Sequence, residues 1–593
     1  MSATALPEKE CDLVMKGGIT SGVVYPGAIT KIAKDFRFRN LGGASAGAIA
    51  AVAAAACEYR RNQGDPAAYD VLDEVQHEIS GQGFVQSLFQ PTAEAKPAFD
   101  LALRLVTTTG SLTQRLLQAG VLILRQDRRF LLGAGLAVLA WLGIAVLAIA
   151  ALLAGGPSGL EIAAAILLGL AALPLGALIV AAFAVAAFVR FGTKLDHALQ
   201  DTWWGMCSGK TEKSKPVDSG LTDWLYQTVQ KCAGNPETPL TFRDLVGDDP
   251  TNADVNLQLI TTDLSASRPA TLPLPEPGTE EKSYFFDPEE WRRLFPEPVV
   301  QHMEKATAGG AVPDPDRGSR MLYPVPGLDL PIVVAARLSL SFPILLSTIP
   351  FWRQDGPDDR FVQHTMSDGG ISSNFPIHYF DSLFPGRPTF GLDLQPWRDK
   401  SQKFVEMSNE PRRAGFSEVR NVGDFFGQIL NAARNWRDNM QAELPGYRDR
   451  ICQIRLTGEE GGLNLNMPAE IVERLVTRGA EAGAEVTNPD SFDWNKHRIT
   501  RFQTMMQMLQ QSLGPLGFGR PGVYQGEHPG RIAFHAVVRE WEQAGRTPVP
   551  PDLPWWMTAI PASDAVYELV ETWPDFDADA PTPKPTLRIV PRA

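Results

Sequence analysis

Residues 40–51 read NLGGASAGAIAA and place one hydroxyl, that of Ser45, among residues that have almost no side chain. The pattern Gly43-x-Ser45-x-Gly47 matches the nucleophile elbow, a sharp strand-to-helix turn that presents the serine oxygen. Glycine is needed at both flanking positions because a larger side chain would collide within the turn. The alternative is a small-residue turn without chemical function, since such short motifs recur by chance.

The segments on either side of this turn favour a strand before it and a helix after it. FRFRNL at 36–41 can form a short strand, and AIAAVAAAACEYRR at 48–61 is rich in alanine, a strong helix former. A helix that starts just after Ser45 directs the positive end of its dipole toward an oxyanion formed there. The sequence therefore predicts a nucleophilic serine between a strand and a helix.

A serine nucleophile needs a base for its proton and donors for the oxyanion. DLVMKGGITSG at 12–22 reads as a buried strand that leads into a glycine-rich turn. Glycines let backbone N–H groups approach a substrate oxygen, so Gly17, Gly18 and Ile19 are the predicted oxyanion-hole donors. The loop could also hold a phosphate, but it lacks the spacing of the nucleotide-binding glycine motifs.

The predicted base is Asp368, which Gly369 and Gly370 follow. A carboxylate on a glycine loop can approach another element closely, although Asp-Gly-Gly is also ordinary turn chemistry. The eight histidines single out no member of a catalytic triad. His364 and His378 lie near Asp368 in the sequence, but isolated histidines are more often structural.

The composition favours a folded protein that binds no nucleic acid. A chain of 593 residues with 44% hydrophobic residues is long enough for several domains or for one with large insertions. Its net charge of -13 argues against an electrostatic grip on nucleic acid. The five cysteines are far apart and form no C-x-x-C pair, so we expect neither a metal site nor a disulfide framework, and no cofactor motif is present. The first residues lack the features of a signal peptide.

Two long uncharged segments, 130–160 and 162–189, lie in the middle of the chain, on either side of Glu161. Each exceeds the roughly 20 residues that cross a hydrocarbon core of about 30 Å as a helix. We expect a transmembrane hairpin rather than two buried core helices, because core helices rarely need so many uncharged residues. Just upstream, SLTQRLLQAGVLILRQDRR at 111–129 could be an amphipathic helix at the membrane interface or an ordinary surface helix.

Basic residues flank the outer ends of the predicted hairpin, and its central turn has none. These residues are Arg125, Arg128, Arg129, Arg190 and Lys194. The positive-inside rule therefore places both outer ends in the cytoplasm. We expect a multi-pass protein of the cytoplasmic membrane whose catalytic domain faces the cytoplasm.

The glycine loop, the elbow and the D-G-G turn, in this order, resemble the patatin-like phospholipase family of acyl hydrolases. The matching motifs are Lys16–Gly22, Gly43–Gly47 and Asp368–Gly370. VNLQLITTDLSASRP at 255–269 is similar to the family's central strand with its TDL turn. AARLSLSFPILLS at 335–347 is similar to the helix that leads toward the family's aspartate strand.

The resemblance implies an α/β fold: a patatin-like three-layer α/β/α domain with a mostly parallel central sheet. The membrane hairpin predicted from the apolar segments is inserted into this domain, between Ser45 and Asp368, and such an insertion is uncommon in the family. It is consistent with four strand-like segments: CDLVM at 11–15, FRFRNL at 36–41, VNLQLITT at 255–262 and PTFGLDL at 388–394. We expect the catalytic domain at 1–125 and 193–486, the hairpin at 126–192 and an α-rich extension at 487–593. In this extension, RITRFQTMMQMLQQSL at 498–513 predicts a core-packing helix, and a proline-rich tail follows.

The resemblance also implies a Ser-Asp dyad in which Ser45 attacks a fatty-acyl ester and Asp368 acts directly as the base. The expected activity is that of a phospholipase A, which cleaves membrane glycerophospholipids through an acyl-enzyme. The bilayer and its phospholipid are then the expected partners, and a homo-oligomer is compatible with the sequence. Two alternatives stay open: a Ser-Asp-His esterase of soluble esters that recruits His528 or His535, and a membrane-anchored scaffold with an inactive site.

Overall fold

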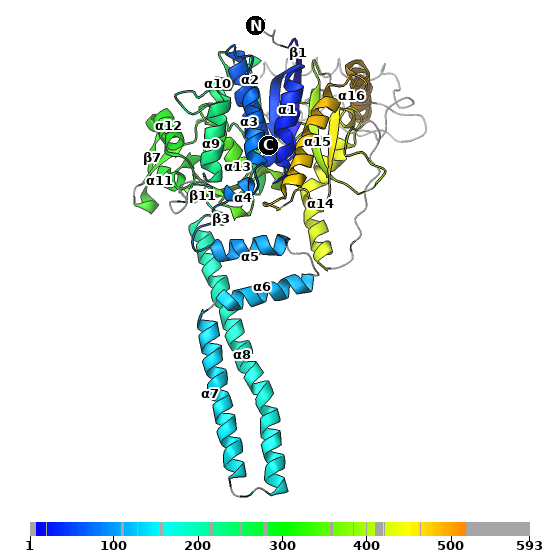
Figure 1. Cartoon of the computed structure of the whole chain (residues 1–593). Coiled ribbons are helices and arrows are strands. Elements are labelled where there is room, and N and C mark those ends of the chain that lie inside the picture. The colour runs from blue at the N-terminus through cyan, green and yellow to red at the C-terminus, as the bar shows by residue number, and fades with distance from the viewer. Residues whose placement is uncertain are drawn as a thin grey trace, which may run out of the picture.

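The structure is a computed structural model of the chain (Figure 1). It describes residues 7–18, 20–107, 112–126, 128–154, 156, 158–212, 219–249, 252–276, 283–318, 320–355, 360–382, 385–398, 400–408, 419, 422–462 and 464–517. The proline-rich tail, His528 and His535 lie outside these residues.

One large sheet organises the described part of the chain. Its strands are β1 Lys9–Met15, β2 Phe36–Gly43, β4 Asn256–Asp263, β5 Arg268–Leu272, β6 Phe285–Phe286, β7 Val312–Asp314, β8 Arg320–Pro324, β10 Ile349–Arg353, β11 Val362–Asp368, β12 Thr389–Pro396, β13 Val405–Met407 and β14 Ile451–Leu456. Their order is β13-β14-β12-β1-β2-β4-β11-β10-β6-β8-β7, and β5 pairs with β4. The central strands β14, β12, β1, β2 and β4 run parallel, and antiparallel strands extend the sheet on both sides. The predicted α/β class with a parallel centre is confirmed, and the four predicted strands are present as β1, β2, β4 and β12.

The helices are α1 Tyr25–Ala33, α2 Ala46–Asn62, α3 Asp70–Ile79, α4 Phe84–Ser87, α5 Lys96–Thr107, α6 Leu112–Gln126, α7 Arg128–Leu153, α8 Gly159–Asp201, α9 Leu221–Cys232, α10 Phe242–Val246, α11 Pro288–Arg292, α12 Glu297–Thr307, α13 Ile332–Ser339, α14 Val422–Ala442, α15 Ala469–Thr487 and α16 Trp494–Gly517. Short 3-10 helices occupy Ser21–Val24, Ala308–Gly310, Pro315–Arg317, Gly369–Ile371 and Arg448–Arg450. Outside the main sheet, β3 Gly205–Cys207 and β9 Ile344–Leu346 form a parallel pair.

The side chains of β1 alternate between two cores, one on each face of the sheet. Leu13 and Met15 belong to the larger core, which also contains residues of α1, α2, α9, α13 and α15, whereas Val14 belongs to a small cluster that includes Ala442 of α14. Successive strand residues point to opposite faces, so burial on both faces requires the continuous apolar run LVM. All eight alanines of α2 are buried, and their small size lets this helix approach the sheet closely.

Helices α7 and α8 form an antiparallel hairpin that projects away from the rest of the chain (Figure 1). Glycines allow their close approach, because a Cβ on Gly133 would lie 2.6 Å from the Phe183 ring and one on Gly176 would lie 3.3 Å from the Trp141 ring. Both helices are long and apolar enough to cross a membrane, and only 6% of each apolar segment is buried. The alternative of two core helices buried against the sheet is therefore wrong.

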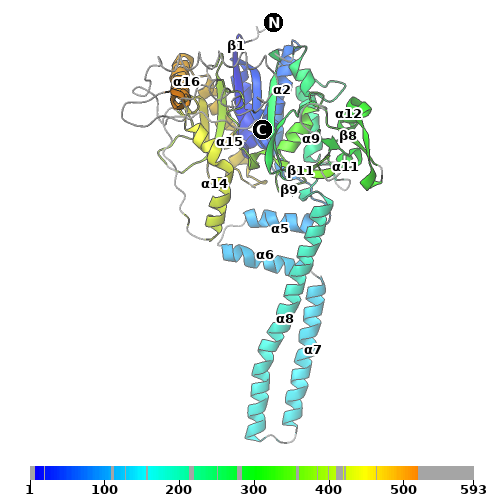
Figure 2. The ribbon, with the colours of Figure 1, turned by 180° about the vertical axis from the view of Figure 1, so that it is seen from behind.

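Helix α8 runs past the predicted hairpin boundary at 192 and ends at Asp201. The segment beyond Val189 carries charged residues, so the helix leaves its apolar stretch and continues toward the sheet domain without a break. Helices α5 and α6 lie across the base of the hairpin, between it and the domain, in both views (Figure 2). The interfacial alternative for α6 stays a prediction.

The parallel strands direct their carboxyl ends toward the hairpin. The start of β1 lies at the end of the domain far from α7 and α8 (Figure 1). Since β2, β4, β12 and β14 run parallel to β1, the loops after all five strands lie at the hairpin side of the sheet. In parallel sheets this carboxyl edge is where ligand sites form.

Helix α16 differs from the core-packing helix predicted at 498–513. Ile499 and Phe502 are 61% and 48% exposed, whereas His497 and Arg501 are buried. The polar residues face inward because they form buried hydrogen bonds, such as that between His497 Nδ1 and an Asp449 oxygen at 2.6 Å. The predicted helix is therefore present, but in its first turns polar side chains, and not Ile499 and Phe502, are buried.

Candidate active site

Ser45 lies between the end of β2 and the first turn of α2, with φ 53° and ψ -127°. A residue with a side chain rarely adopts a positive φ, and strain of this kind concentrates at functional sites. The side chain is buried, with 1% exposure. The backbone thus has the sharp strand-to-helix turn that the elbow motif predicts.

Gly43 and Gly47 both lie where no larger residue fits. A Cβ on Gly43 would lie 2.4 Å from the carbonyl oxygen of Gly47, and one on Gly47 would lie 2.2 Å from that of Met15. Both obstacles are backbone atoms of the elbow and of β1, so they cannot rotate away. The two glycines of the motif are therefore required by the close packing of the turn.

Asp368 ends β11, which pairs with β4 on the side of β4 that faces away from β2. One segment at the end of α13 contacts both predicted catalytic residues. The Ser45 N–H donates to Ser339 Oγ at 3.1 Å, and the Asp368 N–H donates to the Ser341 carbonyl at 3.0 Å. The residues SLS at 339–341 thus bring the elbow and the aspartate loop together.

Burial raises the pKa of Asp368 from 3.8 to about 6, while the Ser45 hydroxyl, Arg434 and the Gly370 N–H each lower it. Oδ1 accepts the Gly370 N–H at 2.7 Å. Oδ2 is buried and accepts no hydrogen bond from any part of the chain that the structure describes. The Ser45 hydroxyl is close enough to favour the charged carboxylate, but no Ser45–Asp368 hydrogen bond of ordinary geometry is formed. Oδ2 is the acceptor left for the serine proton.

The predicted oxyanion donors have different surroundings. The Gly17 N–H donates to the Asn374 carbonyl at 2.8 Å and is therefore occupied. The Gly18 N–H makes no hydrogen bond to a described residue. Ile19 lies outside the described residues. Gly17 instead permits close packing, since a Cβ there would lie 2.2 Å from Asn374 Oδ1 and 3.0 Å from the Ser45 Cβ.

Ala46 supplies a donor that the sequence interpretation did not include. In the first turn of α2, the Gly47, Ala48 and Ile49 N–H groups bond to the carbonyls of Ala44 and Ser45. The Ala46 N–H has no partner among the described residues, as expected for the first N–H of a helix. A donor in the residue after the nucleophile belongs to the oxyanion hole of elbow enzymes, so the motif itself carried this signal.

Gly369 and Gly370 let the aspartate loop pass close to its neighbours. A Cβ on Gly369 would lie 2.1 Å from the Ile260 carbonyl oxygen, a backbone atom of β4. One on Gly370 would lie 2.5 Å from Asn374 Oδ1 and 2.8 Å from Asp368 Oδ1. The glycines therefore allow the Asp368 carboxylate to face the elbow.

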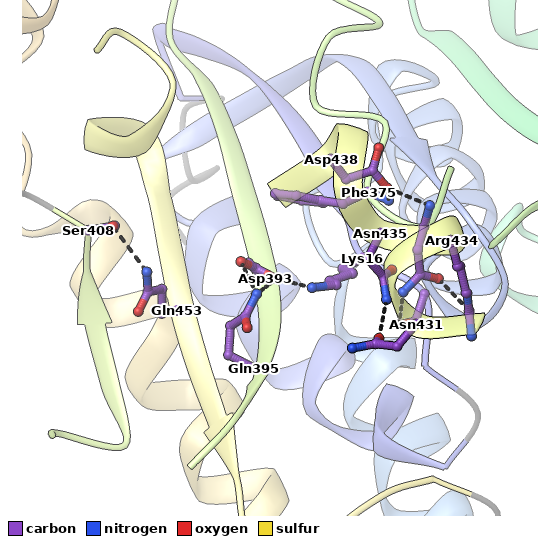
Figure 3. Close-up of polar contacts among 12 residues, drawn as sticks. Lys16, Phe375, Asp393, Gln395, Ser408, Asn431, Arg434, Asn435, Asp438 and Gln453 are labelled. Carbon is purple, nitrogen blue, oxygen red and sulfur yellow. Dashed lines mark hydrogen bonds and ion pairs between the residues drawn. The ribbon is translucent and has the colours of Figure 1, made fainter. Parts of the chain in front are cut away.

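Helix α14 contributes two charged residues that the sequence interpretation missed (Figure 3). Asp438 is buried and accepts hydrogen bonds from the Asn374 N–H at 2.7 Å and the Phe375 N–H at 2.8 Å. Arg434 donates to the Gly370 carbonyl at 2.5 Å and to Asn374 Oδ1 at 2.9 Å. Because Asn374 also holds Gly17, α14 fixes the aspartate loop and the glycine loop together.

Lys16, which precedes the glycine loop, is directed to the sheet (Figure 3). Its ammonium group pairs with a buried oxygen of Asp393 at 2.7 Å, and Gln395 donates to the same carboxylate. This arrangement leaves Arg434 as the cation that acts on Asp368.

The nearby histidines have structural surroundings. His364 contacts Asp263 at 2.7 Å and Asp355 at 3.1 Å, so both of its ring nitrogens are engaged. Burial and the positive charge of Arg437 lower the pKa of His378 to about 4, which keeps its ring neutral. Within the described ranges, no cluster of three or more His, Cys, Asp or Glu side chains could hold a metal ion.

Comparison with models of known protein families finds no match. A solved structure, that of VipD from Legionella pneumophila, is 12% identical and aligns with 97% of this chain and 81% of VipD. Its TM-score of 0.26 is too low to support a statement about the fold. The "RpoH suppressor" of Rhizobium meliloti (strain 1021) is 32% identical in an alignment 670 positions long, which covers 99% of each protein. The chain therefore belongs to the family of this RpoH suppressor.

Proposed function

We propose that the protein is a membrane-anchored acyl hydrolase with a patatin-like catalytic domain and a Ser45–Asp368 dyad. The observation that carries the proposal is the meeting of a strained, buried serine with a buried carboxylate whose Oδ2 lacks another partner. A nucleophile and a base in contact are the minimum that acyl transfer needs. No histidine is required, which agrees with the structural surroundings of His364 and His378.

The first half-reaction transfers the acyl group to the enzyme. Ser45 Oγ attacks the ester carbonyl carbon while Asp368 Oδ2 accepts the hydroxyl proton. The carbonyl oxygen becomes an oxyanion, which the Ala46 N–H, the Gly18 N–H and the positive end of α2 stabilise. Asp368 then returns the proton to the leaving alkoxide, the ester bond breaks, and the acyl group stays on Ser45.

The second half-reaction releases the acid. Asp368 accepts a proton from a water molecule that attacks the acyl-serine, and the same donors stabilise the second oxyanion. When this intermediate collapses, Ser45 Oγ leaves and regains a proton from Asp368. A pKa of about 6 suits both roles, since at neutral pH Asp368 is mostly ionised yet more basic than an exposed aspartate.

A membrane substrate is supported by the placement of the hairpin. Large apolar side chains on α7 and α8 are exposed, such as Leu139 at 67% and Leu147 at 71%, and water is a costly surrounding for such a surface. The carboxyl edge of the sheet, where Ser45 lies, faces the same side. In this proposal the basic flanks hold the catalytic domain in the cytoplasm, and the substrate is a glycerophospholipid cleaved to a fatty acid and a lysolipid.

The test has two steps. The detergent-solubilised full chain is treated with a fluorophosphonate, which we expect to label Ser45; Ser45→Ala should lose the label, and Ser80→Ala, a serine at the end of α3, should keep it. The reconstituted protein should then release fatty acid and lysolipid from phospholipid vesicles. Labelling of another serine would contradict the dyad. Labelling of Ser45 without lipid cleavage would contradict the proposal that the substrate is a glycerophospholipid.

A further inference from the structure

Helix α14 has an exposed apolar stripe, formed by Phe425, Ile429, Trp436 and Met440. These side chains are 52%, 47%, 55% and 62% exposed, respectively. At 100° per residue they lie within about 60° of one another around the helix axis. Large apolar side chains so aligned mark a surface that binds something apolar.

The opposite face of α14 holds the catalytic loops. By the same helical spacing, Arg434 and Asp438 lie on the far side of the helix from the apolar stripe. Asp438 accepts N–H groups of Asn374 and Phe375, and Arg434 contacts Gly370 and Asn374. A single helix therefore joins an exposed apolar surface to the loops around Ser45.

The position of α14 indicates what lies against the stripe. In both views the end of α14 that is farther from the sheet points to the side from which α7 and α8 project, and it reaches the level of α5 and α6 (Figure 1, Figure 2). The exposed apolar segments of the hairpin project from the same side of the domain (Figure 1). Tryptophan is enriched at the membrane–water boundary, and an amphipathic helix with aromatic and aliphatic residues on one face binds there.

We propose that the apolar stripe of α14 contacts the bilayer surface around the hairpin, so that lipid contact helps to hold the catalytic loops. This inference rests on the proposed membrane hydrolase and adds a regulatory element to it. When lipid covers the stripe, α14 stays in place, Asp438 holds Asn374, and Asn374 holds the Gly17 N–H beside Ser45. When the stripe loses its lipid, α14 shifts and the Asn374 contacts loosen.

The first experiment measures lipid contact without using activity. All five cysteines are buried, so a cysteine introduced at Ile429 can be labelled selectively with an environment-sensitive fluorophore. The matched control is Ile499→Cys on α16, an exposed isoleucine at the end of the domain away from the hairpin. In full-length protein reconstituted in phosphatidylcholine–phosphatidylglycerol vesicles, lipids brominated in their acyl chains should quench the label at 429 and not the label at 499.

Two results would overturn the proposal. If the label at 429 emits as the fluorophore does in water and is not quenched, the stripe faces solvent. A blue-shifted label that brominated lipid does not quench would mean that residues 518–593 or a second copy of the chain cover the stripe. Neither result depends on hydrolysis, so this test stands even if the proposed enzymatic activity fails.

The second experiment measures coupling to the site. The double variant Ile429→Ser and Trp436→Ser should lower the ratio of vesicle-lipid hydrolysis to short-chain ester hydrolysis by about tenfold, as expected for about 1.4 kcal/mol of lost apolar contact. The double variant Ile499→Ser and Phe502→Ser on α16 should leave this ratio unchanged. An equal loss in both double variants, or no loss in either, would contradict coupling through α14. Circular dichroism and the melting temperature verify that each variant folds.

Discussion

At the carboxyl edge of the sheet, polar side chains are buried, and in the hairpin, apolar side chains are exposed. Ser45 and Asp368 are each 1% exposed, whereas Leu136 and Leu147 are 66% and 71% exposed. At the edge, burial raises the pKa of Asp368 and removes the water that would weaken its interaction with the serine proton. In the hairpin, exposure is favourable only in a solvent as apolar as the side chains.

The two regions are therefore built for different surroundings, and each should respond to its own kind of change. The proposed active site depends on atoms within hydrogen-bond distance, so the substitution of a single atom should abolish its activity. The hairpin depends on the summed apolar surface of many residues, so only a large alteration should remove its effect. Substitutions at the proposed active site should leave membrane attachment intact, and changes in the hairpin should leave the hydrolysis of a soluble ester intact.

The largest effect is expected from the dyad. Ser45→Ala and Asp368→Asn should each lower kcat/KM for a short-chain ester by roughly a thousandfold or more, and the double variant should lose little beyond that, because the two residues act as one unit. The measurement is steady-state kinetics in detergent. Equal losses that multiply in the double variant would show that the residues act independently.

Stability provides the control for Asp368→Asn. The pKa of this aspartate rises on folding from 3.8 to about 6, so its stabilising contribution is fully present below pH 3.8 and is lost as pH rises through 6. The uncharged asparagine avoids this loss, and we expect the variant to melt no lower than the wild type at pH 8. A strongly lowered melting temperature there would mean that lost activity reflects misfolding.

An intermediate effect is expected from removing the hairpin. Gly133 faces Phe183, so residues 134–182 can be replaced by a short glycine–serine linker without separating the remaining helix ends. Vesicle-lipid hydrolysis should fall by roughly a hundredfold, because the lipid is no longer held at a high effective concentration. The truncated protein should remain in the supernatant after ultracentrifugation and keep its fluorophosphonate labelling. If the truncated protein hydrolysed vesicle lipid as fast as the full chain, the hairpin would not be needed for access to the lipid substrate.

Local patterns in the sequence predicted four central strands, the apolar hairpin and the strand-to-helix turn at Ser45. The elbow, the strands β1, β2, β4 and β12 and the apolar helices depend on neighbouring residues, and alternation or glycine spacing is sufficient to identify them. Asp368 lies far from Ser45 in the sequence, and only the resemblance to a family joined the two. Their spatial connection through the segment 339–341 was beyond any local pattern.

The features of the site and of α16 that the sequence did not predict depend on contacts between residues far apart in the chain. Arg434 and Asp438 sit in an ordinary amphipathic pattern, and nothing in it indicates that they reach the loops at 370 and 374. The sequence predicted the Gly17 N–H as an oxyanion donor, but in the fold this N–H donates to the Asn374 carbonyl. On α16, the hydrogen bonds of His497 and Arg501 bury polar side chains while Ile499 and Phe502 stay exposed, and the apolar spacing of the sequence did not indicate this.

The smallest effect is expected from Arg434, and it is best seen in the pH dependence. Activity on a short-chain ester should rise with pH around a midpoint near 6, because Asp368 must be ionised to accept the serine proton. Arg434 lowers the pKa of Asp368, so Arg434→Gln should move the midpoint upward by up to about one pH unit. Above the new midpoint activity should recover to within a few-fold of the wild type.

Arg434→Lys is the matched control, because it keeps the positive charge but loses the paired hydrogen bonds to Gly370 and Asn374. Its midpoint should stay near that of the wild type, while its maximal rate falls if the loops lose their support. The hairpin-deleted protein should also keep the wild-type midpoint, since none of the groups that set the pKa of Asp368 lies on α7 or α8. If deletion of the hairpin shifted the midpoint of the pH profile, the two regions would not be independent. The surroundings of Asp368 would then be set partly by the membrane.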